Sequence, residues 1–163
     1  MVITVLSRPS LLHHQQRLLP ATRVLSYRVF FFTLYSLGLR LGEGLRLQLA
    51  DIDAAHARVH IRDAKGNKDR FVPLPQATLD LLRRFWQTHR NPVLLFPNRH
   101  AGLNGAASAT TPLDRGGVQI TLRKVTTACG VKKKITPHSL RHYAEFRTMP
   151  SLIRCACHAA HLT

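Results

Sequence analysis

The sequence has few cysteines, few acidic residues and no uninterrupted apolar run long enough to cross a membrane. Its cysteines, Cys129, Cys155 and Cys157, are odd in number and lack framework spacing, which argues against a disulfide scaffold. His158 follows Cys157, but this cluster lacks a fourth ligand and a suitable spacing, so no metal site is expected. The most apolar stretch, residues 24–39, is interrupted by polar and charged residues and falls short of a transmembrane span.

The scarcity of acidic residues leaves a large positive charge. There are 24 Lys and Arg residues against 8 Asp and Glu residues, and the net charge is +16 with histidine neutral. Enzymes for small metabolites do not need this excess, whereas a polyanionic partner explains it because each phosphate contact releases condensed counterions. A generally basic, solvated surface is the alternative. We therefore expect a nucleic-acid partner, no membrane, and a cytoplasmic, nucleoid-associated location, since the first six residues are also too short for a signal peptide.

Length and apolar content favour one folded domain that is mainly helical. The chain has 163 residues, of which 45% are hydrophobic, enough to build one core. Apolar residues recur at three- and four-residue steps over much of the chain, and this period predicts helices. The expected helical segments are 11–19; 24–37, with Tyr27 and Tyr35 in the core; 41–49, with Leu41, Leu45 and Leu49 on one face; 76–90, with Leu79, Leu82 and Trp86 inward; and 116–128, with Val118, Leu122 and Val125 inward.

One β-hairpin is predicted between these helices. Val59 and Ile61 alternate with polar neighbours, which is the period of a half-buried strand, and a second short apolar run follows a turn. We expect residues 57–74 to form an antiparallel hairpin with a long basic tip, residues 51–55 to form a turn, and residues 98–112 to form a loop. The predicted fold class is therefore α+β, mainly helical with a small antiparallel β-hairpin or sheet.

His138 and Arg141 are the residues best suited to phosphate chemistry. Thr136 and Pro137 are typical of the N-cap and the first position of a helix, and residues three apart on that helix project from one face. A phosphate could meet an imidazole, a guanidinium and backbone N–H groups together at this helix start. The alternative is a surface histidine and a surface arginine on an ordinary basic helix.

Arg40 is a second candidate, because it lies at a junction between two predicted helices among apolar neighbours. A partly buried arginine needs a carboxylate or a phosphate as its partner. Glu43, three residues further on, could hold the guanidinium from behind. A structural Arg–Glu pair without any ligand explains the same pattern equally well.

The predicted hairpin tip carries a third group of cations. A glycine and an asparagine at the tip permit the positive φ of a tight turn, so that Lys65, Lys68 and Arg70 project together. Such a hairpin can approach a DNA groove or a scissile phosphate, although an ordinary solvated turn has the same composition. A further basic run, residues 132–134, precedes the predicted helix that opens at Pro137.

Taken in order, these three groups resemble the catalytic domain of the tyrosine-recombinase (phage-integrase) family. YSLGLRLGEGLRLQL, residues 35–49, resembles the first family signature, Gly-Leu-Arg with a glutamate three residues on. DAKGNKDRFVPLP, residues 63–75, resembles the family hairpin with its active-site lysine, and TPHSLRH, residues 136–142, resembles the His-x-x-Arg-His signature. The resemblance covers residues 10–145 and implies a DNA breaking–rejoining enzyme. It also implies site-specific recombination or integration of double-stranded DNA through a phosphotyrosine intermediate. The family uses no metal or nucleotide cofactor, and the lack of a carboxylate cluster in this sequence agrees with a reaction without metal.

The resemblance implies a role for the matching residues on the predicted helices. Arg40 and Arg141 correspond to the two arginines that clamp the scissile phosphate, where they would stabilise charge on the non-bridging oxygens. His138 corresponds to the histidine that assists proton transfer and phosphate binding. Glu43 occupies a family acidic position and is expected to orient Arg40.

The hairpin lysine has its own implied role. Lys65 corresponds to the lysine that protonates the departing 5′ oxygen, with Lys68, the outer lysine of the tip, as the second choice. The residues expected to bind DNA around this site are Lys68, Arg70, Lys132, Lys133, Lys134 and His142.

The sequence departs from the family pattern after Arg141. The family continues with a long helix, a Leu-Gly-His-like segment and then the nucleophilic tyrosine, and residues 144–163 show none of these. Tyr143 does not stand where the family places its nucleophile. We therefore expect a partial catalytic domain over residues 1–143 and a divergent tail over residues 144–163, without room for the N-terminal DNA-clamping domain of many members.

Three hypotheses about function follow from this pattern. The first is a DNA-binding recombinase domain that cannot cleave alone, unless another recombinase subunit supplies the tyrosine. The second is a non-catalytic nucleic-acid-binding remnant of a mobile element. The third is an unrelated basic protein with coincidental motifs, and a convergence of Arg40, Lys65, His138 and Arg141 in space would argue against it.

Overall fold

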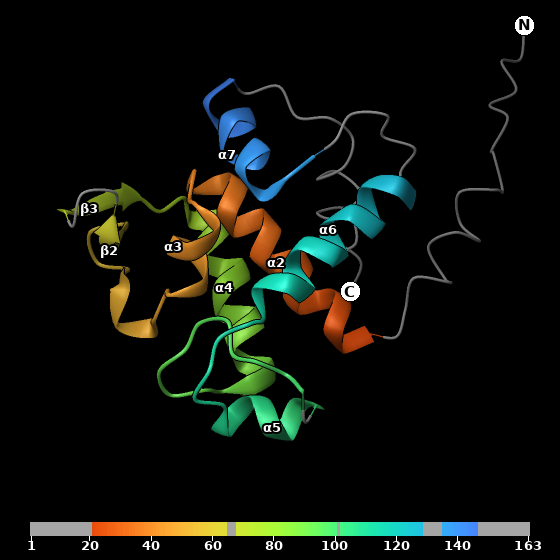
Figure 1. Ribbon diagram of the computed structural model, residues 1–163. Coiled ribbons are helices and arrows are strands. Elements are labelled where there is room, and N and C mark those ends of the chain that lie inside the picture. Colours follow the sequence, from red (N-terminus) through yellow and green to blue (C-terminus); the bar gives the residue numbers. More distant parts are fainter. Residues whose placement is uncertain (1–20, 65–67, 101, 129–134, 147–163) are drawn as a thin grey trace, which may run out of the picture.

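Figure 1 shows the computed structural model, which describes residues 21–64, 68–100, 102–128 and 135–146. The elements follow one another as α2 (Ala21–Ser36), α3 (Leu41–Leu45), η1 (Leu49–Asp51), β1 (Ile52–Asp53), β2 (Arg58–Ala64), β3 (Lys68–Pro73), α4 (Gln76–His89), α5 (Gly102–Ser108), α6 (Arg115–Ala128) and α7 (Pro137–Phe146). Helices dominate, and the sheet formed by the described residues is small and antiparallel. The predicted α+β class is therefore confirmed.

Helix α2 occupies the centre of the molecule, and α3, α4 and α7 pack against it (Figure 1). Its residues Phe30 and Leu34 are fully buried, as expected for a helix with apolar side chains on most of its faces. The ring of Phe96 lies edge-on to Phe30, with centroids 5.0 Å apart, and stacks on Phe85 of α4 at 5.6 Å. The predicted helix over residues 24–37 is confirmed.

The end of α2 sets the direction of the chain into the candidate site. Gly38 adopts the left-handed conformation with a φ of 59°, which a residue with a side chain enters only with strain. The N–H of Leu39 donates to the carbonyl of Leu34 at 2.9 Å and closes the helix end. Arg40 then has extended backbone, and α3 starts directly after it.

The sheet has three antiparallel strands in the order β1-β2-β3. Val59 and Ile61 of β2 are each 1% exposed, so the predicted inward face of the hairpin is confirmed. The expected turn over residues 51–55 is wrong in part, because Ile52 and Asp53 form β1 and pair with β2. A strand of two residues is too short to show a period in the sequence.

The predicted helical face over residues 41–49 is wrong beyond Leu45, where α3 ends. The chain continues in extended form beside a distant segment, and the N–H of Leu95 donates to the carbonyl of Leu47 at 3.2 Å. This pairing brings Leu47 into the core at 2% exposure. Periodicity could not reveal it because the partner lies far along the chain.

Helix α4 confirms the predicted segment 76–90, with one correction to its inward face. Phe85, at 2% exposure, takes the core position that was predicted for Trp86. Trp86 is half-buried, and its indole N–H donates to the carbonyl of Asn91 at 2.9 Å. A buried indole needs such an acceptor, which explains why the ring lies at the edge of the core.

Helix α5 lies within the segment that was predicted to be a loop, residues 98–112. Its alanine, glycine and serine residues carry no helical period. The amide of Asn91 donates to the carbonyls of Ala106 and Ala109, both at 2.9 Å. This side chain therefore satisfies carbonyls at the helix end that would otherwise lack donors, and it does so from another part of the chain.

Helices α6 and α7 agree with the sequence pattern. Val118 and Leu122 of α6 are buried as predicted. Helix α7 begins at Pro137, and the hydroxyl of Thr136 accepts the backbone N–H of Ser139 at 3.2 Å, so the predicted N-cap is confirmed.

Several expectations fall partly or wholly outside the described residues. They are the predicted helix over residues 11–19, the hairpin tip at Lys65, the run 132–134, the cysteines and the tail beyond residue 146. Within the described ranges, none of the helices has the length and apolar character needed to cross a membrane. The same ranges contain no group of three or more side chains arranged to hold a metal ion.

Candidate phosphate-binding site

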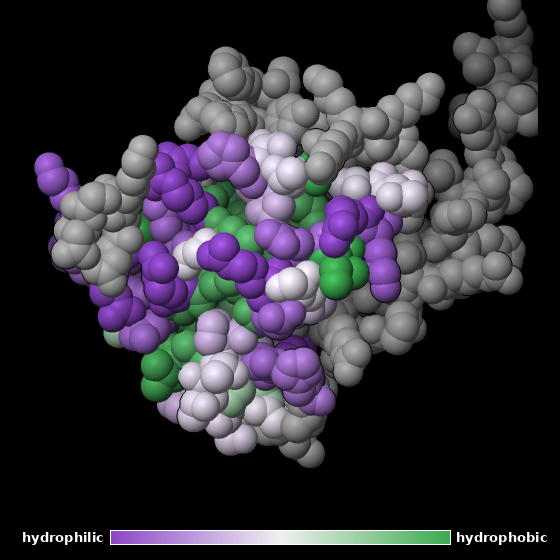
Figure 2. All heavy atoms as spheres, viewed as in Figure 1, coloured by the Kyte–Doolittle hydropathy of each residue, from purple (hydrophilic) through white to green (hydrophobic). Residues whose placement is uncertain are grey.

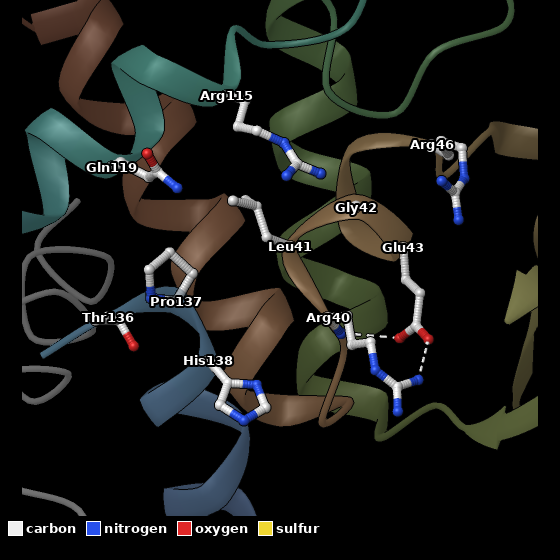
Figure 3. Close-up of a pocket in the computed structure, with 10 residues that line it drawn as sticks. All are labelled: Arg40, Leu41, Gly42, Glu43, Arg46, Arg115, Gln119, Thr136, Pro137 and His138. Carbon is white, nitrogen blue, oxygen red and sulfur yellow. Dashed lines mark hydrogen bonds and ion pairs between the residues drawn. The ribbon is translucent and has the colours of Figure 1, made fainter. Parts of the chain in front are cut away.

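An open pocket of about 510 Å³ lies where α3, α6 and α7 meet (Figure 3). Its lining comes from three segments that are far apart in the sequence: Arg40, Leu41, Gly42, Glu43 and Arg46 around α3; Arg115 and Gln119 of α6; and Thr136, Pro137 and His138 at the start of α7. Figure 2, in the view of Figure 1, shows hydrophilic residues over much of the face on which these elements lie. The pocket thus joins two of the three residue groups singled out in the sequence.

Arg40 is held at the edge of the pocket by Glu43. Its Nη1 lies 2.9 Å from Oε1 of Glu43, and its backbone N–H donates to Oε2 of the same carboxylate at 2.8 Å. The Arg40 side chain is nevertheless 40% exposed, whereas the Glu43 side chain is 3% exposed. The predicted pair therefore exists, and it leaves the guanidinium accessible from the pocket.

Glu43 is charged in spite of its burial. Burial by itself raises the pKa of this carboxyl, but hydrogen bonds from the backbone and side chain of Arg40, together with the charge of Arg70, outweigh burial and hold the pKa below its usual value. The carboxylate is thus a fixed negative charge around which two guanidiniums are arranged.

Arg70 contacts this carboxylate from the hairpin. It belongs to β3, and its Nη2 lies 2.9 Å from Oε2 of Glu43. The sequence pattern grouped Arg70 with the lysines of the tip as a DNA contact. In the structure its guanidinium ties the hairpin to α3, with 34% of the side chain exposed, and its contact with DNA stays a prediction.

Helix α7 supplies His138 to the pocket. Figure 3 shows its imidazole on the same side of the pocket as the Arg40 guanidinium. Arg141 follows one helical turn later and is partly buried, but it is not among the residues that line the pocket. Leu140, at 5% exposure, packs this part of α7 into the core. Because α7 lies against α2, this packing positions His138 and Arg141 relative to α2.

The remaining predicted residues are only partly placed. Lys68 is exposed at the start of β3, and His142 lies in α7, with its side chain outside the described atoms. Lys65 and the run 132–134 lie outside the described residues. The convergence of Lys65 with the other three groups therefore stays a prediction.

Three pocket residues were not singled out from the sequence, namely Arg46, Arg115 and Gln119. Arg115 and Gln119 are four residues apart and share a face of α6. The helix predicted from the sequence, residues 116–128, begins after Arg115, so its spacing did not pair these two residues. Nothing in the sequence indicated that this face would meet α3.

Comparisons with known proteins show the family to which the chain is similar. The model of the phage integrase family matches residues 7–149 of the chain. An integrase/recombinase of Sinorhizobium fredii is 35% identical over 118 residues, which are 72% of this chain and 36% of that protein. Tyrosine recombinase XerC of Listeria welshimeri is 31% identical over 121 residues, which are 74% of this chain and 40% of that protein. The chain thus spans less than half the length of these relatives.

Solved structures share the fold. XerA recombinase matches with a TM-score of 0.56 and 20% identity, over 89% of this chain and 59% of that one. The site-specific recombinase XerH, in a post-cleavage complex with its palindromic difH substrate, matches with a TM-score of 0.59 and 19% identity, over 90% of this chain and 45% of that one.

Proposed function

The chain belongs to the phage integrase family of tyrosine recombinases, and we propose that it binds double-stranded DNA by a phosphodiester group in the pocket between α3, α6 and α7. The activity that this binding serves is site-specific DNA recombination or integration. The observation that carries the proposal is the meeting of Arg40 and His138, which are distant in sequence, in one pocket. The excess of 24 Lys and Arg over 8 Asp and Glu suits the same partner.

Arg40 is proposed as one half of the phosphate clamp. A guanidinium has five N–H donors, and its side-chain contact with Glu43 occupies the Nη1 end. The exposed remainder of the group can bind a non-bridging oxygen and stabilise the charge that develops there during phosphoryl transfer. Glu43 holds the guanidinium in place before DNA arrives, so little ordering is left to the binding step.

His138 and Arg141 are proposed as the other half. They lie one turn apart on α7, so they project from neighbouring positions of one face. The imidazole of His138 can move a proton at the reacting oxygens. Arg141 is proposed as the second arginine on the non-bridging oxygens.

The hairpin is proposed to bring Lys65 to the departing 5′ oxygen. The arrangement of β2 and β3 supports this, because Arg62 of β2 binds Asp51 at 2.9 Å and Arg70 of β3 binds Glu43 at 2.9 Å. The first contact ties β2 to η1, and the second ties β3 to α3. Lys132, Lys133 and Lys134 are proposed as outer contacts to the DNA backbone.

We further propose that this chain does not form a covalent DNA adduct by itself. Of its tyrosines, Tyr27 and Tyr35 lie in α2 and pack against the hydrophobic core. Tyr143 lies in α7 two residues after Arg141, which is not where the family places its nucleophile. The nucleophilic tyrosine would then come from another recombinase subunit.

A nicked suicide substrate tests this directly. The purified chain should leave the labelled DNA without bound protein on a denaturing gel, while a complete recombinase of the family, acting on its own substrate, serves as the positive control. A phosphotyrosyl adduct on the chain would overturn the proposal that it cannot cleave alone.

Binding measurements separate a phosphate site at Arg40 from a diffuse basic surface. With duplex DNA, Arg40→Gln should weaken binding about tenfold, because it removes a charge-assisted contact from the centre of the site. Arg84→Gln, on the exposed side of α4, is the matched control and should have little effect. Equal effects of the two substitutions would indicate only a diffuse basic surface.

A further inference from the structure

Three arginines line the pocket, and the phosphate clamp proposed above uses only one of them. Arg46 follows α3 directly, and Arg115 is the first residue of α6. Figure 3 shows Gly42 between these two guanidiniums, with His138 at the other side of the pocket. The pocket therefore has a second cationic end.

Gly42 allows both guanidiniums to approach one point of the α3 backbone. A methyl group in place of a Gly42 hydrogen would lie 3.3 Å from Nη2 of Arg115 and 3.7 Å from Nη1 of Arg46. The two nitrogens are thus no more than about 7 Å apart, the sum of these distances. One phosphate can bridge donors at that separation, because each charge-assisted hydrogen bond spans about 2.8 Å and two oxygens of the phosphate separate the bonds.

The carboxylate in the pocket is bound by two other arginines. Glu43 is the acidic residue among the lining side chains. Its oxygens bind the guanidiniums of Arg40 and Arg70, each at 2.9 Å. Arg46 and Arg115 add two further guanidiniums to the lining, and the planar fork of a guanidinium matches the geometry of a phosphate.

We propose that Arg46 and Arg115, on either side of Gly42, form a second phosphate subsite that binds a DNA phosphate neighbouring the scissile one. This inference rests on the proposed function, because the scissile phosphate occupies the end of the pocket formed by Arg40 and His138. Neighbouring phosphates of one strand are joined through a single sugar, and the pocket of about 510 Å³ is lined both by Arg40 and His138 and by Arg46 and Arg115. The absence of a side chain at residue 42 leaves the space between the two donors open to an oxygen of the backbone phosphate.

The subsite predicts a specific dependence of DNA binding on salt. We would measure the anisotropy of a fluorescein-labelled duplex of mixed sequence over a range of KCl concentrations, for the full chain and its variants. Arg46→Gln and Arg115→Gln should each weaken binding about three- to tenfold. The double variant should reduce the slope of log Kd against log[KCl] by about one, and not by two, because both residues contact one phosphate.

Gly42→Ala tests the space between the guanidiniums without changing the charge. Alanine is favoured over glycine in a helix, and the atoms that its methyl group would meet are the ends of two long side chains, so the fold should be retained. We expect binding about threefold weaker than wild type, with an unchanged thermal unfolding midpoint. Arg84→Gln removes one charge from α4 and should change Kd and the salt slope by much less.

The outcomes separate this inference from the function on which it rests. A salt slope of the double variant equal to that of Arg84→Gln, or wild-type affinity for Gly42→Ala, overturns the subsite. If Arg40→Gln weakens binding in the same assay, the proposed function survives that result. A wild-type chain without salt-dependent binding to duplex DNA overturns both.

Discussion

Two buried carboxylates, Glu43 and Asp51, make the same kinds of contact in the segment between α2 and the sheet. They differ in the residue whose backbone N–H they accept. Oε2 of Glu43 accepts the backbone N–H of Arg40 at 2.8 Å, and Oδ2 of Asp51 accepts the backbone N–H of Gln48 at 2.8 Å. In both cases the carboxylate lies three residues after the donor and caps the start of a short helical turn.

Each carboxylate also binds one arginine of the hairpin. Arg70 contacts Glu43 and Arg62 contacts Asp51, both at 2.9 Å. The side chains of Glu43 and Asp51 are 3% and 6% exposed. We call these two sets the Glu43 anchor and the Asp51 anchor. The backbone donor of the Glu43 anchor is Arg40, which lines the candidate phosphate pocket, whereas the donor of the Asp51 anchor is Gln48, which does not. We therefore expect the Glu43 anchor to affect both DNA binding and stability, and the Asp51 anchor to affect stability.

Removal of the Glu43 anchor should have the largest effect. Glu43→Ala leaves the backbone N–H of Arg40 without its acceptor and two guanidiniums without their shared carboxylate. Because both arginines are partly exposed, we expect a loss of about 3 kcal/mol of unfolding free energy, at the low end for a buried pair. DNA affinity should fall as well, because Arg40 loses its orientation. Chemical denaturation and duplex binding measure the two effects, and wild-type DNA affinity in a folded variant would separate Glu43 from the site.

Asp51→Ala should reproduce the loss of stability without the loss of binding. The same two kinds of contact disappear, and we expect a decrease of about 2–3 kcal/mol in the free energy of unfolding. DNA affinity should stay within about twofold of wild type, measured at a temperature where the variant is folded. A drop in affinity as large as that of Glu43→Ala would show that the two anchors do not differ in the way proposed.

Mild acid should weaken the protein at a third place, around His89. His89 is 3% exposed, and burial, followed by the charge of nearby Arg99, lowers its pKa to about 4 from an ordinary 6.5. In this pH range the unfolded chain binds the proton and the folded chain does not, so stability is full above pH 6.5 and is lost as the pH falls towards 4. The expected loss is about 2–3 kcal/mol.

The pH dependence has its own control. His89→Phe keeps an aromatic ring beside Phe85 and removes the titrating group, so the slope of stability against pH in this window should largely disappear. Glu43→Ala should keep that slope, because the pKa of the Glu43 carboxyl is held below its usual value and its contribution is lost only at lower pH. An unchanged slope in His89→Phe would assign the acid sensitivity to another group.

The hairpin arginines should show the smallest effects. Arg62→Gln and Arg70→Gln each remove a contact whose arginine is 43% or 34% exposed, and we expect stability losses of about 0.5–1 kcal/mol. Only Arg70→Gln should also lower DNA affinity, by roughly two- to threefold, because it loosens the carboxylate that holds Arg40. Equal DNA affinities for the two variants would remove this last distinction between the anchors.

Local signals in the sequence predicted much of the fold. These signals depend on residues a few positions apart along the chain. They are the helical period of α2, α4 and α6, the alternation of Val59 and Ile61, and the start of α7 at Thr136 and Pro137. The elements that sequence reasoning missed depend on distant partners. Strand β1 exists because Ile52 pairs with β2, and α5 is capped by Asn91 from outside the helix.

The candidate site also combines residues that the sequence indicated with residues that only the packing of distant segments brought together. The motifs around Arg40 and His138 indicated a phosphate site because residue types and short spacings carry that information. Arg46 lies in the first signature stretch without being one of its signature residues, and Arg115 lies outside the motifs. Only their approach to Gly42 makes them a pair. Arg70 was assigned to the tip from its position in the hairpin, whereas its contact with Glu43 depends on how the hairpin packs on α3.

By itself the sequence determined the positive charge, the helical periods and the family to which the chain belongs, since these are properties of residue type and local order. The tertiary structure decided which charges face one another. A guanidinium becomes part of a site only when a partner fixes its direction and an open pocket keeps it accessible. At Arg40 the partner is local, because Glu43 lies three residues on, whereas the pocket is formed by segments that only folding brings together.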